Sequence, residues 1–475
     1  MTNTSQHLEN YIPFTVGIDD TDSPEGMCTT YLGTQMYLQL LKNPLIQIKE
    51  LPFLIRLNPN APFRTKGNGS VIIVGFAHPS IISWLQSTLT KLFLSYSRVD
   101  FEQTNPGLII WYKTISQDLV DLGNRALWDI IEIAEINRFL ALPTVYSFHP
   151  KSKRGLIGSL AGIGLASNLV DFTFELIQYR KPPYTNNRGE NTNSVWKIDE
   201  AKFNLFNCVD FKNKTVKIFP KGLDPVFCGI RGEVPMNLLA YWSAIQPQPD
   251  MDCWMIFKTN QGTDQHLLTT PIVSFSHVKF LPYRVITAIG KIVSNPITEI
   301  GGHVSFEFCD LSSNITKKCY AYEPTKEFRS IILELVTKDV VEIFGNVRPA
   351  EKMRKFQEVI NLEKIKILTL VERKLKRNPA CPKCSKRMES AGKNQPFRCK
   401  KCKITLDKSK VETTILEPKI KENQVFLPAI DAQRHLTKPL NRTNKNKFDD
   451  ENEIKLVLEK ILDQHNHIKN KLSEY

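Results

Sequence analysis

Residues 14–42, FTVGIDDTDSPEGMCTTYLGTQMYLQLLK, carry the pattern that decides how the N-terminal part of this chain folds. Residues 14–18 form a short apolar run of the kind found in buried strands, whereas residues 28–42 repeat apolar side chains at helical spacing. An acidic loop separates these two stretches. The order strand, acidic loop and helix predicts an α/β unit whose loop lies between a strand end and a helix N-terminus.

The acidic loop contains three carboxylates within four residues, Asp19, Asp20 and Asp22. Like charges this close repel one another unless a cation neutralises them, and hard oxygen ligands suit magnesium (Mg2+). Thr29 and Thr30 fall where the predicted helix begins, and the backbone N–H groups at a helix N-terminus favour phosphate. The loop therefore predicts a magnesium–nucleotide site, although an ordinary turn with a helix cap has the same short pattern.

A basic glycine loop, RTKGNG at residues 64–69, offers Arg64 and Lys66 as cations for the same phosphates, although hairpin turns have a similar composition. The sequence contains no Walker-type glycine loop that ends in Lys followed by Ser or Thr. A nucleotide site in this chain would therefore belong to a different family of nucleotide-binding proteins.

Two later segments, DFTFELIQYR at residues 171–180 and GLDPVFCGIRGE at residues 222–233, mix acids with aromatic and apolar side chains. A pocket for a small organic cation needs this combination, because carboxylates balance the charge and apolar walls contact a methylene chain. Glu175, Asp224 and Arg231 are the candidate substrate-binding residues. Ordinary strand and loop positions would explain the same residues equally well.

The C-terminal half begins with short β-rich segments broken by glycine turns, from residue 284 to about residue 347, which predict a small closed barrel. Two C-x-x-C pairs follow, with fourteen residues between them. Zinc (Zn2+) prefers four soft ligands in a tetrahedron, and all four positions are filled, so the spacing predicts a structural zinc ribbon. Its ligands are Cys381, Cys384, Cys399 and Cys402.

Charge is concentrated around this predicted ribbon. Residues 373–410 hold fourteen Lys and Arg against two acids, a net charge of +12, whereas the whole chain has a formal net charge of +14. Such a concentration indicates a surface that contacts a phosphate backbone, although a charge run is more often a solvated face.

Composition sets the outer limits of the interpretation. With 475 residues, at roughly 100–200 residues per domain, the chain is expected to form three or four folding units. Hydrophobic residues are 41% and charged residues 24%, which is typical of a globular protein. No apolar run approaches the ~20 residues that cross a bilayer, and the first ten residues lack a signal-peptide pattern. Because the other six cysteines are scattered, we expect a reducing compartment, the cytoplasm. The lack of a long apolar run predicts that the protein has no membrane partner.

Several motifs occur together in one order. The chain resembles the archaeal tRNA(Ile) 2-agmatinylcytidine synthetase family from about residue 14 to about residue 405. The motifs that carry the resemblance are GIDDTDSPEGMCTTYLG, RGLIGSLAGIG, FTFELIQYR, DPVFCGIRGEVP, TNQGTDQHL, GGHVSFEF, AYEPTKEFR and the CPKC/CKKC ribbon.

The resemblance implies a defined reaction on the isoleucine tRNA that has a CAU anticodon, here called the target tRNA. ATP phosphorylates the C2 oxygen of its wobble cytidine, and agmatine then displaces phosphate to form agmatidine, so that the tRNA decodes AUA. The family takes ATP and magnesium near the GIDDTD loop, which corresponds to Asp19, Asp20 and Asp22. Its autophosphorylated threonine corresponds to Thr29 or Thr30, and we favour Thr30.

The expected architecture is a multidomain α+β protein, and the family resemblance supplies the domain names. Residues 1–124 are expected to form an α/β kinase-like domain and residues 125–272 a ferredoxin-like domain. Residues 280–350 are expected to form a β-barrel OB-fold, residues 376–410 the zinc ribbon, and residues 411–475 a linker and a C-terminal helix.

Two other functions fit parts of the sequence. A non-catalytic RNA-binding protein could combine the barrel and the ribbon, and a kinase for a protein or small molecule could use the acidic loop. The GIDDTD loop with its downstream threonines distinguishes the enzyme from a pure RNA binder, and the +12 ribbon argues against a small lone substrate.

Overall fold

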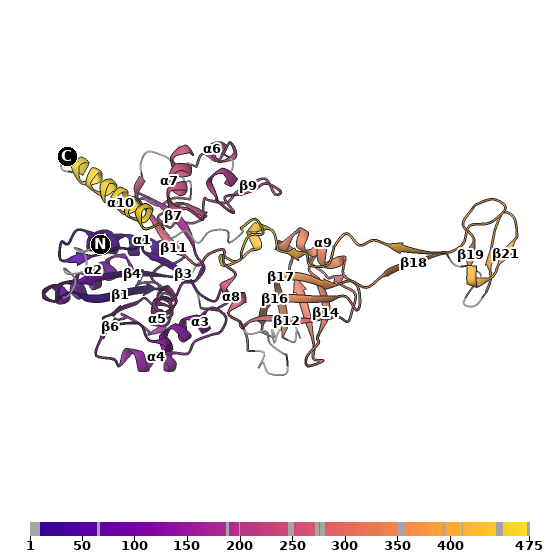
Figure 1. The fold of residues 1–475 in the computed structure, drawn as a ribbon, viewed down its shortest axis with the longest axis horizontal. Helices are drawn as coiled ribbons and strands as arrows, with labels where there is room; N and C mark the ends of the chain where they lie inside the picture. The colour runs from indigo at the N-terminus through magenta and orange to yellow at the C-terminus, as the bar shows by residue number, and fades with distance from the viewer. Residues whose placement is uncertain are drawn as a thin grey trace.

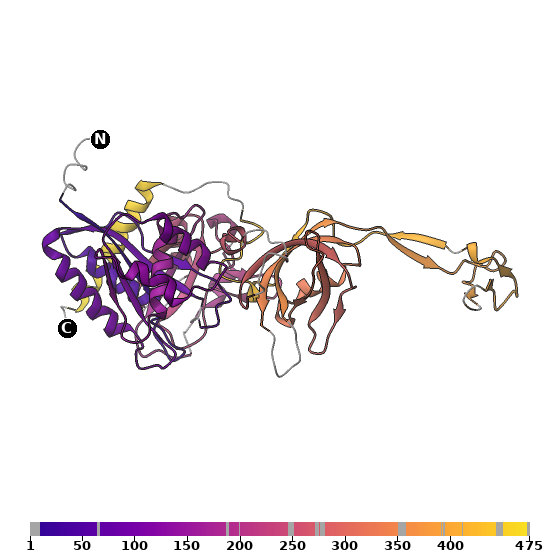
Figure 2. The same cartoon turned by 90° about the horizontal axis from the view of Figure 1, so that it is seen from below.

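In the computed structural model, an α/β body, a barrel and a ribbon follow one another along the long axis of the molecule (Figure 1). The described residues are 10–63, 67–186, 190–198, 200–245, 251–270, 275, 281–349, 358–390, 392, 395–410, 412–442 and 450–472. The C-terminal helix lies on the α/β body, at the end of the molecule where the chain also begins, as Figure 2 shows from a second direction.

In the described part of the chain, the α/β body is built on one nine-stranded sheet with the order β10-β7-β11-β3-β4-β1-β5-β6, in which β2 also pairs with β4. The strands are β1 (Ile12–Asp19), β2 (Ile46–Gln47), β3 (Phe53–Arg56), β4 (Gly69–Ala77), β5 (Gly107–Trp111), β6 (Val145–Phe148), β7 (Thr173–Arg180), β10 (Val226–Gly232) and β11 (Met251–Thr259).

This sheet runs through both of the N-terminal domains expected from the sequence. Strands from the second part flank those of the first on both sides: β11 pairs in parallel with β3, at Lys258 opposite Phe53, and β6 pairs antiparallel with β5, at Phe148 opposite Leu108. Backbone hydrogen bonds therefore join the two halves, and the predicted boundary near residue 124 falls inside a continuous sheet.

Helices cover both faces of the sheet. One face packs against α1 (Thr29–Leu41) and α2 (Ile82–Tyr96), and the other against α3 (Gln117–Ala126), α4 (Ile133–Leu140) and α5 (Arg154–Ala166). Around β7 and β10 lie α6 (Thr192–Trp196), the short pair β8 (Val209–Asp210) and β9 (Thr215–Val216), and α7 (Pro235–Ala244), whereas α8 (Gln265–Leu268) lies between the body and the barrel (Figure 1). Apolar side chains are therefore buried on both sides of the central strands, as expected for an α/β unit.

Glycine allows α5 to approach the sheet closely. A Cβ on Gly107 would lie 2.3 Å from the backbone of Gly155, and a Cβ on Gly17 would lie 2.7 Å from the carbonyl oxygen of Ser159. Heavy atoms do not approach this closely without displacement, so both positions need glycine. The N-terminus of α5 therefore lies directly beside the C-terminal end of β1, where the acidic loop begins.

Within the described residues, the predicted barrel is a closed structure of five strands. It is formed by β12 (Val285–Ile292), β14 (Val304–Asp310), β15 (Thr316–Ala321), β16 (Val340–Arg348) and β17 (Val359–Thr369), with β13 (Ile297–Thr298) and α9 (Glu327–Leu333) at its edges. The strand β12 pairs with both β16 and β14, which closes the barrel, and β15 pairs in parallel with β17. The fifth strand, β17, lies entirely after the range of residues 280–350 that was predicted for the barrel.

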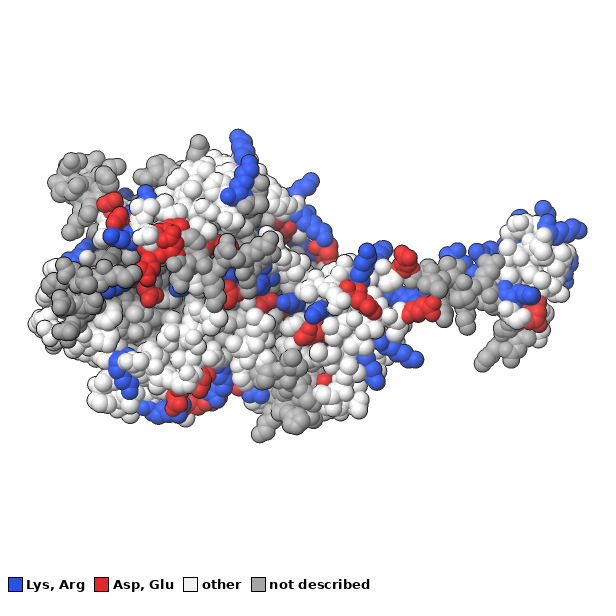
Figure 3. All heavy atoms as spheres, in the orientation of Figure 1, with Lys and Arg blue, Asp and Glu red and all other residues white. Residues whose placement is uncertain are grey.

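The ribbon projects from the barrel on a two-stranded arm, β18 (Arg373–Arg377) paired with β22 (Glu412–Leu416). Its own sheet consists of β19 (Glu389–Ser390), β20 (Phe397–Arg398) and β21 (Thr405–Leu406). Lys and Arg side chains gather on this outlying module, as Figure 3 shows for one face. The excess positive charge of the sequence is therefore displayed far from the α/β body.

The chain then turns back toward the α/β body. Residues 425–442, here called the return segment, begin with β23 (Val425–Phe426), which pairs with β17. Residues 412–442, within the stretch predicted as linker-like, contain β22 and β23 and contact the body through Arg442, which pairs with Asp171 and Glu233. The expected C-terminal helix is α10 (Glu451–Leu472), which buries Val457 and Ile461 in the core of the body.

None of the helices in the described part of the chain combines the length and the apolar character that crossing a membrane requires.

Candidate functional site

The acidic loop lies at the C-terminal end of β1 and is held by groups from α5. Asp19 and Asp20 are buried, with 8% and 7% of their surfaces exposed. The Nε and Nη2 atoms of Arg154 donate to Oδ2 of Asp20 at 3.2 and 3.1 Å, and the backbone N–H of Asn105 donates to the same oxygen at 3.2 Å. Asp20 has a φ of +54°, so the chain turns sharply there and directs both carboxylates toward α5.

This environment carries more negative charge than its partners balance. Burial, together with the neighbouring Asp20 carboxylate, raises the pKa of Asp19 to about 8. Burial also raises the pKa of Asp20 to about 6, although Arg154 opposes this shift. Among the described residues, Oδ1 of Asp20 is buried without a hydrogen-bond partner. Two buried carboxylates with an unpartnered oxygen fit a hard divalent cation, which would supply the missing positive charge.

The shape of the site depends on Gly158 in α5. A Cβ at this position would lie 1.6 Å from Oδ2 of Asp19, so a larger residue would displace the carboxylate. Both aspartates line a cavity of about 120 Å³, together with Asn58 and Phe63 from the loop after β3. The basic loop residues Arg64 and Lys66 lie outside the described residues, and their role remains a prediction.

A larger cavity, of about 350 Å³, lies on the other side of the acidic loop and brings together five of the predicted site residues. These residues are Asp22, Thr30, Glu175, Asp224 and Arg231. Met27, Ile177, Ile218 and Val226 supply apolar walls. The combination of acidic and apolar lining is the one that the sequence indicated for a small organic cation.

The two candidate threonines have different surroundings. Thr30 lines the larger cavity, and its Oγ1 lies 3.0 Å from Sγ of Cys28. Thr29 is buried beneath the loop, where its Oγ1 accepts from the hydroxyl of Thr21 at 3.0 Å and donates to Oδ1 of Asp22 at 3.5 Å. The geometry thus places one hydroxyl at the cavity and the other beside a carboxylate.

Glu175 is not a lone carboxylate. It is buried on β7, where Nε of Arg231 lies 3.1 Å from Oε1 and Nη2 of Arg56 lies 3.8 Å from Oε2, and the amide of Gln261 donates to Oε2. Burial alone would raise the pKa of Glu175, but Arg231 and Arg56 hold it below its usual value. Glu175 therefore anchors the two arginines at the wall of the cavity.

Sequence reasoning missed several basic residues of these cavities. Arg154, Arg56, Lys217 and His435 each line one of them, and they come from α5, β3, the end of β9 and the return segment. A weak signal existed for Arg154, which directly precedes a run of small residues that forms α5. His435 could not have been found in this way, because it follows the last ribbon cysteine by more than thirty residues of mostly polar sequence.

The ribbon brings its four predicted ligands together. The Sγ atoms of Cys381, Cys384, Cys399 and Cys402 all lie within 4.8 Å of one another. Four thiolates at this separation fit a tetrahedral zinc ion with no position left for water, so the metal has a structural role.

Comparisons with known proteins agree with this arrangement. Family models described as the TiaS TCKD domain, the TiaS FLD domain and the TiaS C-terminal zinc ribbon domain match residues 15–83, 153–266 and 378–416. The tRNA(Ile) 2-agmatinylcytidine synthetase TiaS of Archaeoglobus fulgidus is 37% identical over 431 residues, which cover 90% of this chain and 97% of the relative. The corresponding protein of Methanosarcina mazei is 36% identical over 444 residues, with the same two coverages.

Solved structures are similar over nearly the whole chain. A crystal structure of TiaS in complex with its isoleucine tRNA and ATP has a TM-score of 0.77 at 33% identity. A crystal structure of TiaS with the same tRNA, AMPCPP and agmatine has a TM-score of 0.75 at 31% identity. Each match covers 92% of this chain and 99% of the other.

The fold and its sites define a multidomain α+β enzyme in which an acidic α/β body, a five-stranded barrel and a zinc ribbon are joined in one chain. Its similarity extends through all of these parts rather than through one module. The chain belongs to the tRNA(Ile) 2-agmatinylcytidine synthetase family.

Proposed function

We propose that this protein forms agmatidine at the wobble cytidine of the target tRNA, with ATP and agmatine as co-substrates. It is an ATP-dependent tRNA-modifying synthetase, as are the relatives that match 90% of its length. The observation that carries the proposal is the position of the acidic loop between two cavities, one with buried carboxylates and one with acidic and apolar walls.

The reaction explains why two cavities are needed. The C2 oxygen of cytidine is a poor leaving group until a phosphoryl group from ATP is attached to it. The primary amine of agmatine can then bond to C2 and lose a proton, while the C2–O bond breaks and phosphate leaves. Phosphoryl transfer depends mainly on positioning and on charge neutralisation, so cations and carboxylates must be held in a fixed arrangement around the phosphates.

We assign the smaller cavity to the metal and the nucleotide. Asp19 and Asp20 would hold magnesium, which when bound would neutralise the phosphate charge of ATP. The unpartnered Oδ1 of Asp20 supports this assignment. Arg154 orients the Asp20 carboxylate, and the basic loop with Arg64 and Lys66 would contact the phosphates.

We assign the larger cavity to agmatine and the target base. Asp22 and Asp224 would bind the cationic ends of agmatine, and the apolar walls would contact its methylene chain. Glu175 and Arg231 would form the fixed wall against which the base is placed. Either Thr29 or Thr30 would be phosphorylated during the reaction, since one hydroxyl lies beside Asp22 and the other lines the cavity.

The remaining bodies would hold the tRNA. We propose that the barrel is an OB-fold, which the closed five-strand order with one parallel pair, β15 with β17, supports among the described strands. We also propose that residues 1–124 and 125–272 are the kinase-like and ferredoxin-like domains, whose strands share one sheet. The basic ribbon would contact the phosphate backbone of the tRNA. Since the substrate is a tRNA, we also propose that the reaction takes place in the cytoplasm.

The test is agmatine incorporation into a transcript of the target tRNA in the presence of ATP and magnesium. The variant Asp20→Asn should lose product formation while it still binds tRNA, because the carboxylate is removed without altering the ribbon. Asp118→Asn, which changes an exposed carboxylate on α3, is the matched control and should remain active. Normal product formation by Asp20→Asn would refute the assigned metal site, and the absence of product from the unmodified protein would favour a non-catalytic RNA binder.

A further inference from the structure

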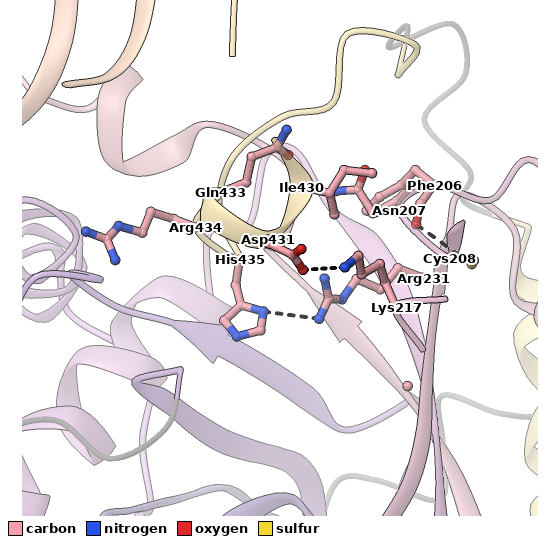
Figure 4. A pocket seen from close by; sticks show the side chains of 11 residues that line it. Phe206, Asn207, Cys208, Lys217, Arg231, Ile430, Asp431, Gln433, Arg434 and His435 are labelled. Carbon is pink, nitrogen blue, oxygen red and sulfur yellow. Dashed lines mark hydrogen bonds and ion pairs between the residues drawn. The ribbon is translucent and has the colours of Figure 1, made fainter. Parts of the chain in front are cut away.

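A third cavity, of about 260 Å³, adjoins the larger one and contains residues that the proposed reaction has not used. The two cavities share Lys217, Gly229, Arg231 and His435 as lining residues. One wall of the third cavity comes from the loop before β8, the end of β9 and β10. The other wall is the return segment, whose Asp431 and His435 side chains point toward Lys217 and Arg231 in Figure 4.

The return segment is held firmly enough to form a wall. Its Arg434 lies 3.5 Å from Oε1 of Glu363 in the barrel and donates to Oδ1 of Asn60 in the body at 3.0 Å. The backbone N–H groups of Gly262 and Asp264 donate to carbonyl oxygens of the segment at 2.9 and 2.7 Å. These contacts connect the segment to both the barrel and the body, so its position is set by the junction of the two.

The charges around this cavity do not balance. The carboxylate of Asp431 contacts Nζ of Lys217 and lies 3.6 Å from Nζ of Lys326. One carboxylate is therefore paired with two ammonium groups.

Glu175 is likewise one carboxylate paired with two guanidinium groups, those of Arg231 and Arg56. Among the described charged residues that line the third cavity, Lys217, Arg231 and Arg434 outnumber the single carboxylate, Asp431.

His435 contributes to the geometry of this cationic wall. Its Nδ1 lies 3.1 Å from Nη2 of Arg231. A guanidinium has only donor groups, so Nδ1 must accept this hydrogen bond and the ring is oriented by it. The contact therefore holds the Arg231 guanidinium between Glu175 and His435, at the boundary of the two cavities.

We propose that this cavity is a phosphate-binding subsite in which Lys217 and Arg231 bind a phosphate group of a substrate. A small polar cavity with surplus positive charge, carried by a guanidinium and an ammonium, suits a phosphate oxyanion and disfavours cationic agmatine. The inference rests on the proposed function, and it allows two sources of phosphate. One is the phosphodiester next to the target base, which would lie close to a base held in the adjoining cavity, and the other is the triphosphate of ATP.

In this subsite Asp431 occupies the position of a competing anion. Its carboxylate contacts Lys217 across the cavity, as Figure 4 shows, and a bound phosphate would share or replace that contact. Removing the cation and removing the carboxylate should therefore have opposite effects on phosphate binding. If Lys217 and Asp431 only formed a structural ion pair, both changes would lower phosphate binding in the same direction.

The experiment compares Lys217→Met and Asp431→Asn in equilibrium binding of a target tRNA transcript and, separately, of ATP. Lys212→Met, which removes an exposed lysine of the β8–β9 turn, is the matched control. Lys217→Met should weaken tRNA binding by roughly 5- to 10-fold and reduce the salt slope by about 1, because one phosphate contact is lost. Asp431→Asn should tighten tRNA binding by about 2- to 3-fold, and Lys217→Arg should restore affinity.

Opposite effects on ATP instead of tRNA would support the subsite and assign the nucleotide as its source. Equal weakening by Lys217→Met and Asp431→Asn would overturn the proposal, as would a Lys217→Met variant that matches Lys212→Met for both ligands. These binding measurements do not depend on product formation. If the unmodified protein formed no product, the proposed catalytic function would fail, and the binding data would still test the subsite on their own.

Discussion

Replacing Arg442 with methionine should release the return segment from the body. The Arg442 side chain is only 2% exposed and joins the segment to Asp171 and Glu233. Its Nη1 also donates to the carbonyl oxygen of Gly262 at 2.7 Å, and its Nη2 to that of Phe172 at 2.9 Å. Methionine has a similar length and apolar stem, so the change removes these polar contacts while it keeps most of the packing.

The size of the effect follows from what is left behind. Removing one partner of a buried ion pair costs about 3–5 kcal/mol. The Asp171 and Glu233 side chains remain 32% and 26% exposed, so water recovers part of this cost. We therefore expect a loss of about 2–3 kcal/mol, which corresponds to a roughly 30- to 150-fold increase in opening of the segment.

Hydrogen exchange measured by mass spectrometry would test this expectation. Exchange in residues 434–442 should accelerate by about two orders of magnitude, whereas exchange in the central strands β1 and β4 should stay unchanged. Arg138→Met removes a cation from an exposed pair with Asp118 and should leave both regions unchanged. Unaltered exchange in residues 434–442, or acceleration in β1 and β4 to the same extent, would refute the assignment of Arg442 as an anchor of this segment.

Two further changes test other parts of the molecule. Cys399→Ser should lose zinc, measured by metal analysis, and weaken tRNA binding, because the exposed cations of the ribbon lose their fixed arrangement; unchanged affinity would show that the ribbon does not contact RNA. Burial would raise the pKa of Glu363, but His266 and Arg434 lower it to about 2, so its stabilisation is present above about pH 4.5 and lost as the pH falls through 2. The unmodified protein should therefore be more stable than Glu363→Gln by about 3 kcal/mol at pH 6. This difference in the free energy of unfolding should shrink below pH 4.5, as measured by denaturation at a series of acid pH values. A constant difference would contradict the stabilising role of the Glu363 contacts with His266 and Arg434.

The sequence was most informative where chemistry and partners lie close together along the chain. The four cysteines occupy two C-x-x-C turns, so the zinc site was predictable from spacing, and the structure brings all four Sγ atoms together. The acidic loop was likewise predicted at a strand end before a helix, where β1 and α1 place it. In both cases a few neighbouring residues contain nearly all of the relevant groups.

The division of the site between cavities was not predictable in this way. Asp19 and Asp20 line one cavity and Asp22 another, although they are separated by three positions at most. The turn at Asp20, with its positive φ, sends consecutive side chains in different directions. Such a turn depends on how α5 and β5 pack around the loop, because Arg154 and Asn105 hold Asp20 in place.

The amino-acid sequence by itself determined the modules of this protein, since hydrophobic period, ligand spacing and turn residues act over a few neighbouring positions. Only the tertiary structure decided how those modules share a sheet and a site. The parallel pairing of β11 with β3 and the approach of His435 to Arg231 join residues that are about 200 positions apart. Contacts of that kind depend on strand register, close glycine packing and the balance of buried charges, which no local stretch of sequence contains.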